Sequence, residues 1–215
     1  MDGNGRWAKS KGQSRHYGHK IGSSKVYEVF KYCTELGCNT ATFFAMSSEN
    51  MSRKTSETDF ISNLLSSSIE KHFSDLLENK IKFRVIGDLS ALPKNILDII
   101  KMAEHETRMF TGYRLNVAYN YGGHWDIIQS INAALSNHED INYATVSKYL
   151  STEGNYPDLI VRTGGYKRLS NFMLWQSAYS ELKFLDILWP DISKNIISKI
   201  FNEYANIKRK FGLVE

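Results

Sequence analysis

Short apolar runs, rich in β-branched and aromatic residues, alternate along the chain with longer segments in which apolar residues recur at helical spacing. The short runs are nearly continuous in apolar residues, as parallel strands tend to be, and predict strands over 40–46, 81–86, 114–119 and 158–162. The longer segments predict helices over 19–36, 56–79, 94–110, 123–137, 143–150 and 192–208. This alternation is typical of an α/β domain with a central, mostly parallel sheet surrounded by helices.

A single domain is expected over residues 1–215, because the chain has three prolines, no internal repeat and no low-complexity linker. Its 42% of hydrophobic residues can form a core, which excludes disordered and collagen-like proteins. The two cysteines, Cys33 and Cys38, predict neither a disulfide framework nor a zinc site, so a cytoplasmic setting is expected. No apolar stretch approaches the roughly 20 residues that cross a bilayer.

The net charge of +4 is a mild basic bias, and no basic run is longer than 208–210. Nucleic-acid binding would require a basic face and a salt-sensitive affinity. Five of the nine arginines instead fall in separate polar segments, so no nucleic-acid partner is expected.

Three polar segments follow predicted strands, over 47–53, 120–126 and 163–171. In parallel sheets ligands gather at the carboxyl ends of the strands, so the first and third segments are candidate binding loops. His124 and Trp125 in the second segment are interpreted as packing and turn residues. The third segment places Arg162, Arg168 and Ser170 around a Gly-Gly pair, which favours an anion cradle.

A further polar turn, DGNGRW, opens the chain. Its two glycines would let the backbone approach a ligand closely, Arg6 could hold phosphate oxygens, and Asp2 suits magnesium that bridges phosphates. An ordinary surface turn is the alternative, since short motifs match by chance. Arg15 and His19 share a helical face, and the glycines at 18 and 22 are expected to leave that face open to a ligand.

The segment 47–53 offers hydroxyls, a carboxylate, an amide and a guanidinium, although its serines could equally cap the next helix. Glu181 is an isolated acid that could join Asp2 on a metal or pair with Lys183. The helix over 56–79 has an apolar face, which core packing explains for the most part. The serines at 66–68 interrupt it and are expected to leave room for something narrow and apolar.

These segments together resemble the cis-prenyltransferase family. The blocks that carry the resemblance run in the family's order from residue 2 to residue 212: DGNGRWA, RHYGHKIG, SSENMSR, NYGGHWDI, PDLIVRTGGYKRLSNFMLWQSAYSELKFLDILWPD and RKFG. The resemblance implies a parallel sheet ringed by helices, with a hydrophobic tunnel for a growing prenyl chain. The implied reaction adds isopentenyl diphosphate, with cis double bonds, to an allylic diphosphate such as farnesyl diphosphate, and depends on Mg²⁺. An undecaprenyl diphosphate product would be a lipid-carrier precursor for peptidoglycan, and a homodimer with peripheral membrane association is implied.

The resemblance also implies roles for individual residues. Asp2 is implied to be the catalytic aspartate and a magnesium ligand, with Glu181 as the second ligand. Asn50 is implied to act in proton removal. The implied substrate-binding residues are Gly3, Asn4, Gly5, Arg6, Trp7, Arg15, His19, Ser47, Ser48, Glu49, Met51, Arg53, Arg162, Arg168, Leu169 and Ser170.

Three positions depart from the family pattern. Met51 replaces a Trp, which leaves the choice of allylic substrate open. Tyr166 replaces a Glu and removes one charge near the diphosphates, and Lys210 replaces an Arg that would present a forked guanidinium. Product length is left open, because it depends on how Ile61 and the leucines at 64 and 65 close the tunnel.

Two alternatives share the fold. One is a synthase of short or branched products, and the other is a non-catalytic partner subunit, which would lack Asp2 and the arginine and glycine motifs present here. Family members have an apolar strand ahead of the DGNGRW turn, so a leading segment is expected upstream of Met1. Without it, Asp2 is expected to be poorly anchored.

Overall fold

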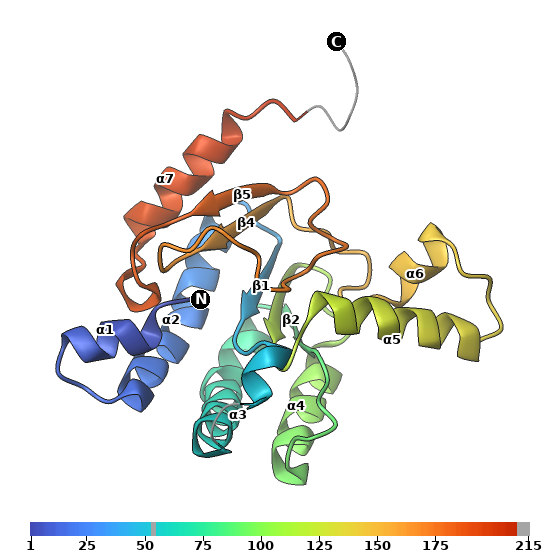
Figure 1. The fold of residues 1–215 in the computed structure, drawn as a ribbon, viewed down its shortest axis with the longest axis horizontal. Helices are drawn as coiled ribbons and strands as arrows, with labels where there is room; N and C mark the ends of the chain where they lie inside the picture. Colours follow the sequence, from blue (N-terminus) through green and yellow to red (C-terminus); the bar gives the residue numbers. More distant parts are fainter. Residues whose placement is uncertain (53–54, 210–215) are drawn as a thin grey trace.

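The computed structural model describes residues 1–52 and 55–209 of the chain (Figure 1). The described helices are α1 (Asn4–Ser10), α2 (Arg15–Glu35), α3 (Thr55–Glu78), α4 (Lys94–Thr107), α5 (Gly123–Ser136), α6 (Tyr143–Tyr149) and α7 (Lys194–Ala205). The strands are β1 (Thr40–Phe44), β2 (Ile81–Ile86), β3 (Tyr113–Ala118), β4 (Leu159–Arg162) and β5 (Glu181–Phe184). Two short 3-10 helices, η1 (Ser48–Ser52) and η2 (Trp189–Asp191), lie in loops. The predicted α/β class is confirmed.

The strands pair in parallel in two groups. β3 lies between β1 and β2, with Val117 opposite both Phe43 and Val85, whereas β4 pairs with β5. Arg162, the last residue of β4, lies opposite Phe184. The prediction of parallel strands is therefore confirmed, and the candidate site residues that follow β1 and β4 come from two different sheets.

Two elements differ from the sequence prediction. The opening DGNGRW segment is a turn only at Gly3, whose φ of 110° caps α1, and the residues from Asn4 onward are helical. β5 was not predicted, because its residues ELKF lie within a longer mixed run that has no clear strand boundaries. The other predicted strands and helices exist, with ends that move by a few residues.

The main core lies between the three-stranded sheet and the helices α2, α3 and α4, and α7, which packs against α2, extends it with Ile197. Large apolar side chains from every layer are buried there, among them Phe30, Leu76, Ile96 and Ile100. A smaller cluster on the other side contains Tyr121, which Trp125 packs against, as the sequence analysis predicted for that turn. No helix in the described part of the chain is both long and apolar enough to span a membrane.

Candidate functional site

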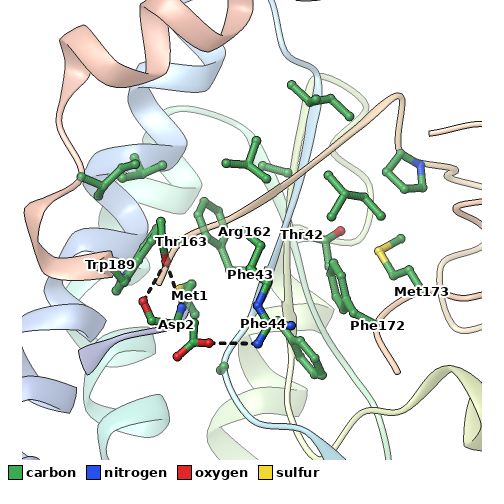
Figure 2. Close-up of a pocket in the computed structure, with 18 of the residues that line it drawn as sticks. Met1, Asp2, Thr42, Phe43, Phe44, Arg162, Thr163, Phe172, Met173 and Trp189 are labelled. Carbon is green, nitrogen blue, oxygen red and sulfur yellow. Dashed lines mark hydrogen bonds and ion pairs between the residues drawn. The ribbon is translucent and has the colours of Figure 1, made fainter. Parts of the chain in front are cut away.

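Asp2 is held at the carboxyl end of β4 by its own backbone. Its N–H donates to Thr163 Oγ1 (3.0 Å), and its carbonyl oxygen accepts a hydrogen bond from that hydroxyl (2.8 Å) (Figure 2). The same carbonyl oxygen accepts a second hydrogen bond from the backbone N–H of Trp189 (3.0 Å). The expectation that Asp2 is poorly anchored is therefore wrong. These contacts arise because the Thr163 side chain can both donate and accept.

The Asp2 carboxylate faces two arginines. Arg162 Nη2 donates to Asp2 Oδ2 at 2.9 Å, and Arg6 Nη2 approaches Asp2 Oδ1 at 3.3 Å while it donates to Gly164 O at 2.8 Å. Burial opposes ionisation of this carboxyl, but the guanidinium of Arg162 and, to a smaller extent, that of Arg6 outweigh burial and lower the pKa of Asp2. Asp2 is therefore an anion over the whole neutral pH range.

Arg162 also organises the loop that follows β4. Its Nη1 donates to the carbonyl of Arg168 and to Ser170 Oγ, the latter at 2.7 Å. The sequence expectation that Arg162, Arg168 and Ser170 form a cradle around two glycines thus has a concrete geometry. Gly164 has φ +91°, and a Cβ there would lie 2.6 Å from Arg6 Nη2, so only glycine lets the guanidinium approach the loop.

The glycines of α2 have a different role from the one expected. A Cβ on Gly18 would lie 2.1 Å from Asn4 O, and one on Gly22 would lie 2.1 Å from Asn4 Oδ1. The two glycines therefore let α1 cross α2 at close range, and do not open a ligand-binding face. This crossing fixes Gly3, Asn4, Gly5 and Arg6 against the end of β4.

Arg15 and His19 do lie together on one face of α2, at the rim of a cavity that both residues line. Both approach Glu57 Oε1 at the start of α3, Arg15 Nε at 2.9 Å and His19 Nε2 at 3.3 Å. The sequence analysis did not select Glu57, because a carboxylate in the first turn of a helix has an ordinary explanation in the helix dipole. It links the arginine and the histidine to α3.

The loop after β1, which contains Ser47 and η1, forms another part of the rim of the same cavity. Ser47 pairs with Tyr121 in an isolated bridge, and Asn50 N–H donates to Ser47 O at 3.0 Å, which starts η1. Burial opposes ionisation of Glu49, but an Asn171 hydrogen bond and nearby hydroxyls lower the pKa of its carboxyl. Ser47 and Ser48 therefore lie at the start of η1 and do not cap α3, which begins at Thr55.

Asn171 joins three loops of the site. Its Nδ2 donates to Glu49 Oε1 (2.6 Å), its Oδ1 accepts from His124 N–H (3.0 Å), and its carbonyl accepts from Gly123 N–H (2.6 Å). The sequence analysis did not select Asn171. The signal that could have found it is an Asn beside Ser170 in a loop, since both residues have positive φ and Asn tolerates this conformation.

A cavity of about 1530 Å³ connects these rims and continues between the facing edges of β1 and β4. Its mouth is lined by the polar residues described above, together with Leu169. Its interior is apolar and includes Val29, Phe43, Met46 and Ile61, while Phe44, Phe172 and Met173 face it from the other side (Figure 2). This volume exceeds the roughly 300–1,000 Å³ of common small-ligand pockets.

Some expected residues lie elsewhere. Trp7 stacks on Tyr17 and donates its indole N–H to Asp191 Oδ1 (2.7 Å), so its ring is used in packing outside the cavity. Met51 packs against the main core, and Ser48 is likewise outside the cavity lining. Arg53 and Lys210 lie outside the described residues.

Glu181 lies at the opposite end of the β4–β5 pair from Asp2. It begins β5 opposite Leu159, and Leu159 precedes Arg162 by three residues, or about 10 Å along β4. The register therefore places Glu181 and Asp2 at opposite ends of this strand pair within one chain, and the role of Glu181 as a magnesium ligand stays a prediction. Its backbone N–H donates to Asp158 O at 2.9 Å.

The serines of α3 also have a local explanation. Ser68 Oγ lies 2.8 Å from Ser23 Oγ, and Ser66 and Ser67 donate to the carbonyl of Asn63. Ser68 therefore contacts α2, Ser66 and Ser67 bond within their own helix, and none of the three lines the cavity. Of the three residues expected to close the tunnel, Ile61 lines the cavity, whereas the leucines at 64 and 65 do not.

The donors present suit magnesium only if a substrate supplies most of its ligands. No group of three or more His, Cys, Asp or Glu side chains within the described ranges could hold a metal alone. Magnesium is commonly bound by one or two carboxylates plus phosphate oxygens, and Asp2 presents one carboxylate beside two arginines, Arg6 and Arg162, that suit phosphate. The site therefore fits a magnesium ion that arrives with a diphosphate.

Comparison with known proteins agrees with this geometry. Residues 1–212 match the family model described as putative undecaprenyl diphosphate synthase. The chain is 41% identical to a ditrans,polycis-undecaprenyl-diphosphate synthase of Buchnera aphidicola, over 99% of this chain and 88% of that protein. A Haemophilus influenzae protein of the same name is 40% identical, over 100% and 93% of the two chains.

Solved structures show the same relationship. Lavandulyl diphosphate synthase from Lavandula x intermedia, in complex with dimethylallyl diphosphate, has a TM-score of 0.92 at 31% identity and covers 99% of this chain and 95% of its own. A probable undecaprenyl diphosphate synthase from Campylobacter jejuni has a TM-score of 0.82 at 31% identity, over 89% and 92%. With its anionic Asp2, converging arginines and apolar cavity, the chain belongs to the undecaprenyl diphosphate synthase family of prenyltransferases.

Proposed function

We propose that this enzyme condenses isopentenyl diphosphate units onto farnesyl diphosphate and releases a long polyprenyl diphosphate, namely undecaprenyl diphosphate. The observation that carries the proposal is the Asp2 carboxylate between Arg6 and Arg162 at the mouth of a large, apolar cavity. A diphosphate would bind at this charged mouth and the hydrocarbon chain would enter the apolar interior. The curated relatives from Buchnera and Haemophilus are named as specific for (2E,6E)-farnesyl diphosphate.

The arginines would act on the leaving group. When the C–O bond of the allylic diphosphate breaks, the electron pair goes to pyrophosphate, and Arg6 offsets the developing negative charge together with the other guanidinium groups of the mouth. Such donors stabilise a transition state most effectively when they are already in place. Hydrogen bonds to Gly164 and Asp2 hold Arg6 and Arg162 before a substrate binds.

The second half of the reaction would occur between the two rims. The isopentenyl double bond attacks the allylic carbon, a C–C bond forms, and a proton then leaves the resulting cation. Asn50 is a weak base, so we assign it an orienting role, in which its amide directs the proton toward a diphosphate oxygen. Asn50→Ala should then slow single-turnover condensation, and near-normal condensation would exclude this role.

Asp2 would hold Mg²⁺ together with diphosphate oxygens. The bound ion would neutralise charge on the leaving group. Removal of divalent cations with a chelator should abolish condensation, and added Mg²⁺ should restore it.

The decisive experiment is incubation with farnesyl diphosphate, radiolabelled isopentenyl diphosphate and Mg²⁺, followed by chromatography of the products. The expected product is a chain of about the undecaprenyl length. Arg162→Lys should strongly reduce condensation, since Lys lacks the guanidinium fork, whereas Arg108→Lys at an exposed helix end should not. Failure of the folded, full-length enzyme to condense the substrates would contradict the proposal.

A branched or short-chain synthase is the second candidate function. The observation that favours it is the TM-score of 0.92 with lavandulyl diphosphate synthase. The same product analysis separates the two candidates, because a product of 10 to 20 carbons would exclude the undecaprenyl assignment and leave prenyl transfer intact. A non-catalytic subunit is disfavoured, since Asp2, Arg6, Arg162 and Arg168 are all present.

We also infer a homodimer in the cytoplasm that associates peripherally with membranes. Exposed apolar side chains on α5 support self-association, with Ile128 59% and Leu135 57% exposed. The membrane association would come from the apolar product. Sedimentation of the purified enzyme, with and without vesicles, tests both statements.

A further inference from the structure

Tyr166 lies among the arginines of the site, at the position where the family resemblance leads one to expect Glu. Its ring centroid is 4.3 Å from Cζ of Arg168, 5.0 Å from Cζ of Arg6 and 5.9 Å from Cζ of Arg162. These distances are within the roughly 6 Å range of cation–π interactions. A single neutral ring thus contacts guanidinium groups that come from α1, from the end of β4 and from the loop after it.

The backbone before Tyr166 brings the ring to this place. Gly164 and Gly165 both have positive φ, 91° and 80°, and their N–H groups donate to the carbonyls of Ile187 (2.7 Å) and Leu185 (2.8 Å). The chain is therefore turned back over the cluster and fixed to the segment after β5. Tyr166 lines the cavity and is 44% exposed, so the ring is in the mouth and not in the core.

The ring and a carboxylate would use different parts of a guanidinium. A carboxylate accepts hydrogen bonds from the N–H groups at the edge of the guanidinium, which are the donors that a phosphate needs. An aromatic ring interacts with a guanidinium through its π face and accepts none of these edge hydrogen bonds. The guanidinium of Arg168 lies over the Tyr166 ring in this way. Tyr166 can therefore hold the cations together without neutralising them.

We propose that Tyr166 is a positioning residue that arranges Arg6, Arg162 and Arg168 for a diphosphate while the ring itself occupies none of their N–H donors. The proposal rests on the assignment of this mouth as a diphosphate site, and it concerns what sets the affinity of that site. Preorganised groups lose less conformational freedom on binding, so removal of the ring should weaken diphosphate binding. The phenol hydroxyl has no part in this role.

The test uses inorganic pyrophosphate as the probe and calorimetry on the full chain. Tyr166→Leu removes the ring and should raise the Kd for pyrophosphate about five- to twentyfold, whereas Tyr166→Phe should bind as the unchanged protein does. In the condensation assay, Tyr166→Leu should raise the KM for the diphosphate substrate that binds at this mouth, with little change in kcat. Tyr143→Leu is the matched control, since Tyr143 is 66% exposed, stacks on Trp175 and does not line the cavity.

Two results would overturn the proposal. An unchanged pyrophosphate Kd in Tyr166→Leu would show that the ring does not position the arginines. Tighter binding in that variant would show that the ring obstructs the site. Because the binding experiment needs no turnover, its failure is distinct from failure of the proposed reaction, which the condensation assay of the unchanged protein decides.

Discussion

Replacement of Asn171 by Ala tests whether one side chain holds the three loops of the site together. Ala removes the hydrogen bond from Nδ2 to Glu49 Oε1 (2.6 Å) and the bond that His124 N–H donates to Oδ1 (3.0 Å). It also places Ala, which has a Cβ but no polar side chain, at φ 61°, a backbone conformation that Asn tolerates better than Ala does. All three losses act in the same direction.

The size of the effect follows from these three contributions. A hydrogen bond to a charged group contributes about 1.5–3 kcal/mol when buried, and this one is exposed, so about 1 kcal/mol is a fair value. The bond from the backbone N–H contributes about 0.5–1.5 kcal/mol, and the left-handed backbone costs Ala about 1 kcal/mol. Asn171→Ala should therefore lower the free energy of unfolding by about 2–4 kcal/mol.

Urea unfolding followed by tryptophan fluorescence measures this change. Asn171→Gly is the matched variant, because it loses the same two hydrogen bonds but accepts the positive φ, and it should cost about 1 kcal/mol less than Ala. A double-mutant cycle with Glu49→Gln isolates the link between the two loops. A loss below about 0.5 kcal/mol for Asn171→Ala, or equal losses for Ala and Gly, would refute the reasoning.

Three further predictions concern stability. Gly22→Ala should destabilise the protein by about 1–3 kcal/mol in urea unfolding, because its Cβ would lie 2.1 Å from Asn4 Oδ1, and a wild-type midpoint would contradict the close crossing. Arg162 lowers the pKa of Asp2 below its ordinary value of 3.8, so the ionised Asp2 stabilises the folded state above that pH. The free energy of unfolding that Asp2→Asn loses at pH 7 should therefore shrink as the pH falls below about 4, and a difference that stays constant with pH would disprove this linkage. Burial raises the pKa of Glu104, so ionisation of its carboxyl destabilises the folded state as the pH rises. Glu104→Gln should therefore raise Tm at pH 7 but not at pH 4, and a lower Tm at pH 7 would exclude burial of the charge as the cause.

Much of the fold could be predicted because the strands coincide with short runs that are apolar or, as in β2, alternate buried apolar residues with Lys82 and Arg84. The run 81–86 matches β2 residue for residue, and the neighbouring predicted strands shift by at most two residues at an end. β5 could not be predicted in this way, since Glu181 and Lys183 give it the composition of a surface segment. The division into two sheets depends on which edges pair, and no local pattern encodes that.

The site was predictable where chemistry and position coincide. Arg162 and Asp2 were selected because a charged residue beside a strand end or a glycine turn suggests a ligand, and they form one ion pair at 2.9 Å. Asn171 was not selected, because an Asn in a loop has many uses and its three partners are distant in the sequence. Gly18 and Gly22 were misread, since a glycine on a helix permits close packing of either a ligand or another helix.

The two rims of the cavity mouth follow β1 and β4, which belong to different sheets, and this separation affects how much a bound ligand stabilises the fold. Asn50 follows β1 and Arg162 ends β4, and no hydrogen-bonded ladder joins these two strands in the part of the chain that the structure describes. A ligand that contacts both rims would therefore clasp the halves of the domain, and its binding would add to the free energy of unfolding by about 2.7 kcal/mol at a concentration one hundred times its Kd. The enzyme would then be most rigid when its mouth is filled, and each product release would loosen the whole molecule.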